Sequence, residues 1–193
     1  MATTRKSKTR RVIDGLGDRS IVLVGMMGSG KSAIGKMLAT KLGIEFRDSD
    51  AEIELAAGRS VADIFEEYGE AEFRRVEERV ISRLLSEGPL VLALGGGAFM
   101  NEATREAIDQ RGVSVWLDVE LGTLLERVMR KPGKRPLLSK GDPAEILGKL
   151  LEKRTPIYSD ADVQVTAIPG TKSDMRNHVL DCLDRQLAHE ISA

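Results

Sequence analysis

The segment GMMGSGKS, residues 25–32, holds the first side chains whose types and spacing could do chemistry. It matches the pattern of glycine, any four residues, glycine, lysine and serine or threonine that forms phosphate-binding loops. The glycines let the backbone turn its N–H groups toward an anion, and the helix expected next adds its positive N-terminus. Lys31 would place a charge at the β- and γ-phosphates, and the Ser32 hydroxyl could ligate Mg²⁺. The segment predicts a nucleoside-triphosphate site.

Two carboxylates, Asp48 and Asp50, follow the next predicted strand. Loops at the carboxyl ends of parallel strands line the ligand crevice, and residues two apart in an extended segment share a side. Asp48, nearer the strand, suits Mg²⁺, directly or through water. Asp50 lies further out, where it would orient an acceptor hydroxyl and could take its proton. Alternatively, Asp50 caps the helix that follows, and its residue type leaves both roles open.

Two arginines are candidates for binding an anionic acceptor. Arg74 follows Phe73, which is expected to face inward, so Arg74 would lie at the edge of the buried face and could lean into the cleft. Arg154 lies at a predicted helix end, before Pro156. Singly, such residues are more often surface groups, but two converging guanidinium groups would bind a carboxylate or phosphate.

A triple glycine, residues 95–97, follows a buried strand. It is either a tight turn or a place where the backbone must come close to a ligand. The strand does not end in an acid, which disfavours a motor-type ATPase and leaves Asp48 as the better metal ligand. Arg135 lies in a segment rich in proline and glycine, residues 131–143. A mobile basic loop there could close over both substrates and stabilise the transferring phosphoryl group.

Apolar periodicity places these residues on alternating strands and helices, which predicts an α/β fold of three layers around a parallel sheet. The predicted strands are residues 21–24, 44–48, 89–94, 113–119 and 163–167. The predicted helices are about 31–42, 49–57, 61–68, 70–87, 102–111, 121–130, 144–154 and 173–191. Pro156 is expected to end the helix that contains Arg154.

The 193 residues are enough for one domain, which we place at residues 19–193. Residues 1–18 start with a basic stretch, and we expect a disordered extension rather than a targeting or nucleic-acid-binding arm. A net charge of −1 gives no reason to expect nucleic-acid binding, and no apolar run is long enough to span a membrane. A single cysteine excludes an internal disulfide and favours the cytoplasm.

The motifs GMMGSGKS, DSD, FRRVE, GGG, RPLL and RTPIY, in this order, resemble those of the shikimate kinase family. The resemblance runs from about Ile21 to the C-terminal helix. It implies a P-loop kinase fold with a five-stranded parallel sheet, a substrate-binding insertion at about 48–80 and a mobile lid at about 128–143. It also implies transfer of the γ-phosphoryl group of ATP to the 3-hydroxyl of shikimate, in aromatic amino-acid biosynthesis, by a cytoplasmic and monomeric enzyme.

The resemblance assigns roles to particular residues. Lys31, Asp50 and Arg135 would be catalytic, Asp50 by holding the reacting hydroxyl. Ser32 and Asp48 would hold Mg²⁺, with no adenine-contacting residue assigned. The ATP-binding residues would be Gly28, Ser29, Gly30, Lys31, Ser32, Ala33 and Arg135. The shikimate-binding residues would be Asp50, Arg74, Gly96 and Arg154, the two arginines on the substrate carboxylate. The alternatives are a kinase for another small hydroxy acid, such as gluconate, and a P-loop regulatory switch.

Overall fold

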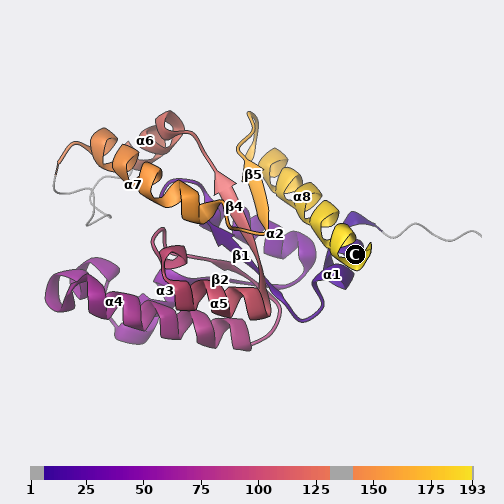
Figure 1. Ribbon diagram of the computed structural model, residues 1–193, viewed down its shortest axis with the longest axis horizontal. Coiled ribbons are helices and arrows are strands. Elements are labelled where there is room, and N and C mark those ends of the chain that lie inside the picture. The colour runs from indigo at the N-terminus through magenta and orange to yellow at the C-terminus, as the bar shows by residue number, and fades with distance from the viewer. Residues whose placement is uncertain (1–6, 131–140, 193) are drawn as a thin grey trace, which may run out of the picture.

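A five-stranded parallel sheet forms the centre of the protein and is covered by helices on both faces (Figure 1). The computed structural model describes residues 7–130 and 141–192. The strand order is β2-β3-β1-β4-β5, and every neighbouring pair is parallel. The strands are β1 (Ser20–Val24), β2 (Glu45–Asp48), β3 (Leu90–Ala93), β4 (Gly112–Asp118) and β5 (Val163–Thr166). The predicted three-layer α/β fold is confirmed.

Eight α-helices and one 3₁₀ helix occur in the described residues. They are α1 (Lys8–Leu16), α2 (Lys31–Leu42), α3 (Ser49–Ala57), α4 (Val61–Ser86), η1 (Ala98–Met100), α5 (Glu102–Arg111), α6 (Leu121–Met129), α7 (Pro143–Tyr158) and α8 (Lys172–Ser192). Most predicted boundaries agree closely with these ranges. The predicted break between two helices near residue 69 is found as a kink inside α4, where Gly69 has φ 79° and ψ 170°.

Two hydrophobic cores lie on opposite faces of the sheet. Along β1, Ile21 and Leu23 belong to the core beneath α1, α2 and α8, whereas Val22 and Val24 belong to the core beneath α4, α5 and α7. All four side chains are buried, as expected for a central parallel strand. The sheet is therefore rigid behind the loops that leave the carboxyl ends of its strands.

The predicted end of α7 at Pro156 is wrong. The helix continues to Tyr158, and Pro156 lies in its last turn. Proline disrupts a helix chiefly by removing one N–H and crowding the carbonyl four residues before it. Near the C-terminal end of α7, a proline removes one backbone hydrogen bond, and no further helical turn follows that it could disrupt. The extra residues matter because they place Tyr158 on the same helix as Arg154.

The prediction of a disordered extension over residues 1–18 is also wrong where the structure describes it. Residues 8–16 form α1, which begins at the cap residue Ser7 and buries Val12 and Leu16 against the core beneath α8. Two ion pairs join this segment to α8, Lys8 with Asp181 and Arg11 with Asp184, and Arg19, directly after it, pairs with Glu190. The basic residues thus have intramolecular acidic partners, which the charge count alone did not reveal. Residues 1–6 lie outside the described residues.

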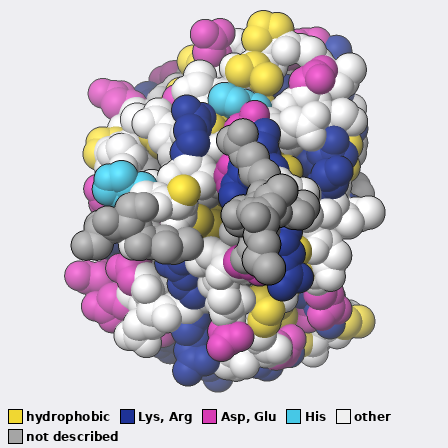
Figure 2. Space-filling model, turned by 90° about the vertical axis from the view of Figure 1, so that its right-hand side faces the viewer, with side chains coloured by type: hydrophobic (Ala, Val, Ile, Leu, Met, Phe, Trp, Pro, Cys, Tyr) yellow, Lys and Arg dark blue, Asp and Glu magenta, His cyan; other side chains and the backbone are white. Residues whose placement is uncertain are grey.

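Charges of both signs are interspersed on the face that Figure 2 presents, with no broad region of a single sign. Among the described residues, no helix has the length and apolarity needed to cross a bilayer.

The docking of α1 predicts a measurable stability effect. Leu16→Ala should lower the free energy of unfolding by about 2–4 kcal/mol, because it leaves a cavity where a side chain only 3% exposed now packs. The measurement is urea unfolding followed by circular dichroism. Arg10→Ala, on the exposed side of α1, is the matched control and should change stability by less than about 1 kcal/mol. Equal stability of the two variants would contradict the docking.

Candidate active site

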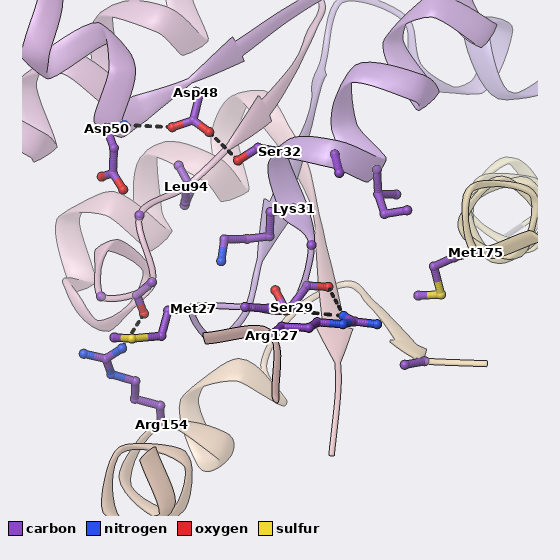
Figure 3. Close-up of a pocket in the computed structure, with 18 of the residues that line it drawn as sticks. Met27, Ser29, Lys31, Ser32, Asp48, Asp50, Leu94, Arg127, Arg154 and Met175 are labelled. Atoms are coloured by element: carbon purple, nitrogen blue, oxygen red, sulfur yellow. Dashed lines mark hydrogen bonds between the residues drawn. The ribbon is translucent and has the colours of Figure 1, made fainter. Parts of the chain in front are cut away.

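One cavity of about 750 Å³ opens at the carboxyl ends of β1, β2 and β3. It brings together the sequence-predicted site residues from five separate segments of the chain, as Figure 3 shows for several of them. Arg135 lies outside the described residues. The predicted residues that line the cavity are Gly28, Ser29, Gly30, Lys31, Ser32, Ala33, Asp48, Asp50, Arg74, Gly96 and Arg154.

The loop between β1 and α2 has backbone conformations that require glycine. Gly25, Gly28 and Gly30 have φ values of 135°, 85° and 100°. A Cβ atom on Gly25 would also lie 2.9 Å from the carbonyl oxygen of Leu117 on β4, so a larger residue would not fit there. The loop leads directly into α2. The N-terminal N–H groups of α2 and the positive end of its dipole face the same cavity as the loop.

Lys31, the first residue of α2, folds back over the loop. Its ammonium group donates hydrogen bonds to the carbonyl oxygens of Gly25, at 2.7 Å, and Met26, at 3.0 Å. The side chain is 9% exposed, and Figure 3 shows it extending into the cavity toward the side where Asp50 lies. A cation held in this way is positioned before any anion arrives.

Ser32 and Asp48 meet at the wall of the cavity. The Ser32 hydroxyl donates to Asp48 Oδ2 at 2.6 Å (Figure 3). The other oxygen, Oδ1, accepts from the N–H groups of Asp50, at 3.2 Å, and Ala51, at 3.5 Å, so Asp48 is the N-cap of α3. A hydroxyl and a carboxylate are hard oxygen donors that fit Mg²⁺, which commonly uses one or two protein carboxylates and fills its octahedron with water and phosphate oxygens.

Asp50 lies in the first turn of α3, so the alternative in which it caps that helix is wrong. Its side chain enters the cavity instead. Burial raises the pKa of Asp50 to about 6, and the nearby Asp48 carboxylate adds to the rise, whereas the charges of Lys31 and Arg74 oppose it. A carboxylate with this pKa is ionised at neutral pH and is a stronger base than an exposed one.

Arg74 reaches the cavity from α4, with its guanidinium group near the rings of Phe65 and Phe73. Its Nη1 atom donates to Glu77 Oε2 at 2.7 Å. Glu77 is 2% exposed, and its Oε1 atom has no hydrogen-bond partner among the described residues. Burial raises the pKa of Glu77, and the adjacent Arg74 limits the rise. The ion pair with Glu77 fixes the guanidinium group of Arg74. The next residue, Arg75, is exposed to solvent.

The triple glycine lies against the side chains of Asp50, Glu77 and Arg74. A close approach of its backbone to a ligand stays a prediction. A Cβ atom on Gly95 would lie 2.5 Å from Asp50 Oδ1 and 2.7 Å from Glu77 Oε1. On Gly97 it would collide with the guanidinium group of Arg74. Side chains at residues 95–97 would therefore fill the space that the charged groups use.

Arg154 enters from α7, and its Nη1 atom donates to the carbonyl oxygen of Gly96 at 2.8 Å (Figure 3). Tyr158, one turn later, donates its hydroxyl to the same oxygen at 2.5 Å. Reasoning from the sequence missed Glu77 and Tyr158. The spacings Arg74–Glu77 and Arg154–Tyr158 bring each pair to one helix face, and this signal could have identified both.

The far end of the cavity is lined by α6 and by the chain from β5 into α8. Arg127 donates to the carbonyl oxygens of Gly28, at 3.2 Å, and Ser29, at 3.4 Å. Ile168 and Met175 add apolar surface at this end. On one side of the glycine loop the cavity has the cation of Arg127 and a more apolar end. On the other side it has the guanidinium groups of Arg74 and Arg154 and the carboxylate of Asp50. It can hold a polyphosphate nucleotide next to a small anionic molecule.

Comparison with known proteins agrees with this geometry. The family model for "Shikimate kinase" matches residues 27–184. A shikimate kinase of Mesorhizobium japonicum is 51% identical over 179 residues, 92% of this chain and 88% of that protein. One from Brucella canis is 43% identical over 98% of this chain and 93% of its own length.

Solved structures agree as well. Shikimate kinase from Acinetobacter baumannii in complex with shikimate superposes with a TM-score of 0.83 at 38% identity, covering 88% of this chain and 95% of that one. A gluconokinase from Sinorhizobium meliloti, 20% identical with a TM-score of 0.57, shares the fold and covers 90% of this chain and 96% of its own. With the family model matching most of its length and relatives similar along nearly all of it, this chain belongs to the shikimate kinase family.

Proposed function

We propose that this protein transfers the γ-phosphoryl group of ATP to the 3-hydroxyl of shikimate, giving shikimate 3-phosphate and ADP. The observation that carries the proposal is the cavity itself, in which Lys31 and the glycine loop lie across from Asp50, Arg74 and Arg154. The relative from Acinetobacter baumannii, whose structure contains shikimate, has the same fold at 38% identity.

The nucleotide would bind at the glycine loop. N–H groups of residues 28–33 and the Lys31 ammonium would hold the β- and γ-phosphates, with Lys31 exchanging its carbonyl partners for phosphate oxygens. Ser32 and Asp48 would hold Mg²⁺, which neutralises charge on the phosphates. Arg135 is proposed from the sequence alone as a further cation at the transferring group.

The acid substrate would bind on the other side. Arg74 and Arg154 provide guanidinium groups for its carboxylate, and the Phe65 and Phe73 rings give one wall. Asp50 would accept the hydrogen bond of the reacting hydroxyl and align its oxygen with the γ-phosphorus. With a pKa of about 6, Asp50 is charged at neutral pH and can take the hydroxyl proton as the new bond forms.

Two further proposals concern the setting of the reaction. We infer that the protein works in the cytoplasm, as its single cysteine favours. We also infer that it acts as a monomer, because the described groups that line the cavity come from one chain. Neither nucleic acid nor a membrane has a part in this reaction.

An ADP-release assay tests the proposed reaction. We expect ADP formation from ATP and Mg²⁺ to depend on shikimate, and gluconate or the absence of an acceptor to give background rates. Shikimate-independent ADP release would instead indicate a nucleotide-driven switch. Turnover with gluconate alone would indicate another hydroxy-acid kinase.

Replacing Arg74 tests the assignment of the acid pocket. Arg74→Ala should raise KM for shikimate by about 10- to 100-fold, because a hydrogen bond between charged groups contributes about 1.5–3 kcal/mol. KM for ATP should stay near its original value. Thermal denaturation is measured in parallel, since the variant leaves the Glu77 carboxylate buried without its cation. The matched control is Arg75→Ala, which removes an exposed guanidinium from the same helix turn and should change neither KM. A rise in KM for ATP would place Arg74 at the nucleotide.

The raised pKa of Asp50 predicts a pH-dependent cost to stability. Below about pH 4 the carboxyl is protonated in both folded and unfolded states, whereas above pH 6 the folded protein must hold a buried charge. Asp50→Asn should therefore equal the original protein in stability at pH 4 and exceed it at pH 7.5 by at most about 3 kcal/mol. It should also lose nearly all activity.

Urea unfolding at the two pH values measures this difference. Asp109→Asn, on the exposed face of α5, is the control and should show no such change between pH 4 and 7.5. An Asp50→Asn protein that is less stable at pH 7.5 than the original would show that the ionised carboxylate stabilises the fold.

A further inference from the structure

The peptide group between Gly96 and Gly97 is held from one side by two donors of α7. Its carbonyl oxygen accepts from Tyr158 Oη at 2.5 Å and from Arg154 Nη1 at 2.8 Å. The Tyr158 side chain is fully buried and its ring stacks with Phe99 and Trp116, at centroid distances of 6.4 and 5.9 Å. Packing thus fixes the ring, and the ring fixes the place of the hydroxyl.

The remaining polar groups of the triple glycine are largely satisfied within the fold. The N–H of Gly95 donates to Ser49 Oγ at 2.9 Å, and its carbonyl accepts from Ala98 N at 3.1 Å. The carbonyl of Gly97 accepts from Met100 N at 3.1 Å. The N–H groups of Gly96 and Gly97 differ, because neither has a hydrogen-bond partner in the part of the chain that the structure describes. Of these two, the Gly97 N–H belongs to the peptide that α7 holds.

In a trans peptide the C=O and the next N–H point in opposite directions, and the described residues contain no cis peptide. Holding the Gly96 carbonyl against α7 therefore directs the Gly97 N–H away from α7. Gly97 lines the cavity and lies against the guanidinium group of Arg74. The orientation of the Gly96–Gly97 peptide therefore determines whether the Gly97 N–H points toward the acid-binding side of the cavity.

We propose that Tyr158 is a positioning residue for the acid substrate: its hydroxyl fixes the Gly96–Gly97 peptide so that the Gly97 N–H is presented to an oxygen of the bound acid beside Arg74. The inference rests on the proposed function for the identity of that acid. Tyr158 is not among the residues that line the cavity, so it would act through the peptide.

Arg154 alone could not perform this task as well. Its guanidinium group is also proposed to bind the substrate carboxylate, so the ligand as well as Gly96 would set its orientation. Among the described residues, the Tyr158 hydroxyl contacts only groups of the fold: the Gly96 carbonyl, the Met26 sulfur at 4.0 Å and the guanidinium group of Arg154. Burial raises the pKa of Tyr158 to about 12, so the hydroxyl remains a donor over the whole working range of pH.

Tyr158→Phe tests the proposal because it removes the hydroxyl and keeps the ring. We expect the dissociation constant of shikimate, measured by calorimetry, and its KM to rise roughly three- to tenfold, as for loss of one neutral hydrogen bond. KM for ATP should not change. In ¹⁵N spectra, shikimate should shift the Gly97 amide proton strongly in the original protein and much less in the variant.

The matched control is Ser114→Ala. It removes another buried hydroxyl, which donates to Asp162 at 2.6 Å away from the cavity. It should lower the melting temperature without affecting shikimate. If Tyr158→Phe behaved in the same way, or if the Gly97 amide did not respond to shikimate in the original protein, the inference would be overturned and the proposed function would stand. Failure of the original protein to use shikimate would instead overturn the proposed function.

Discussion

The arrangement of this site depends on keeping ionised groups of both signs buried together. Asp50 and Glu77 lie close enough to the triple glycine that a single methyl group would touch both. Two like charges at this depth are tolerable because Lys31 and Arg74 lie beside them, and the cost that remains is visible in the raised pKa of each carboxyl. A nucleotide and an anionic acceptor would add negative charge to this balance, which the cationic side chains and the proposed Mg²⁺ would offset.

The fold provides this balance by bringing separate segments to one edge of the sheet. β1 leads to the glycine loop, β2 to Asp48 and Asp50, and β3 to the triple glycine, while α4 and α7 approach from the side with their arginines. The glycines at positions 25, 95 and 97 leave room that any larger residue would occupy. Buried strands behind the loops prevent the charged groups from separating to relieve their repulsion.

Much of this could be predicted from sequence because the signals were local. The phosphate loop, the alternating strands and helices, and the turn at residues 95–97 each depend on short runs of residues. The sequence could not tell whether Asp48 or Asp50 caps α3. The two lie two residues apart, and only backbone geometry decides which carboxylate accepts from the free N–H groups at the start of the helix.

The errors came from long-range contacts. The basic N-terminal segment docks as a helix because Val12 and Leu16 pack against the core beneath α8, and acidic residues of α8, about 170 positions away, pair with it. The cap residues Ser7 and Gly17 are local signals that could have indicated the helix. Pro156 was expected to end α7, but the helix continues for about half a turn beyond it, to Tyr158. That half-turn brings Tyr158 to Gly96, a contact that depends on packing against β4 and η1.

The central claim is that one cavity holds both reactants, with the acceptor hydroxyl on Asp50 and the nucleotide on the glycine loop. The most direct measurement is a crystal structure with Mg²⁺, a non-hydrolysable ATP analogue and shikimate. The account predicts the shikimate carboxylate at Arg74 and Arg154, its 3-hydroxyl within hydrogen-bond distance of Asp50, and that oxygen in line with the terminal phosphorus. Shikimate bound in the opposite orientation, with its carboxylate toward the nucleotide, would contradict it.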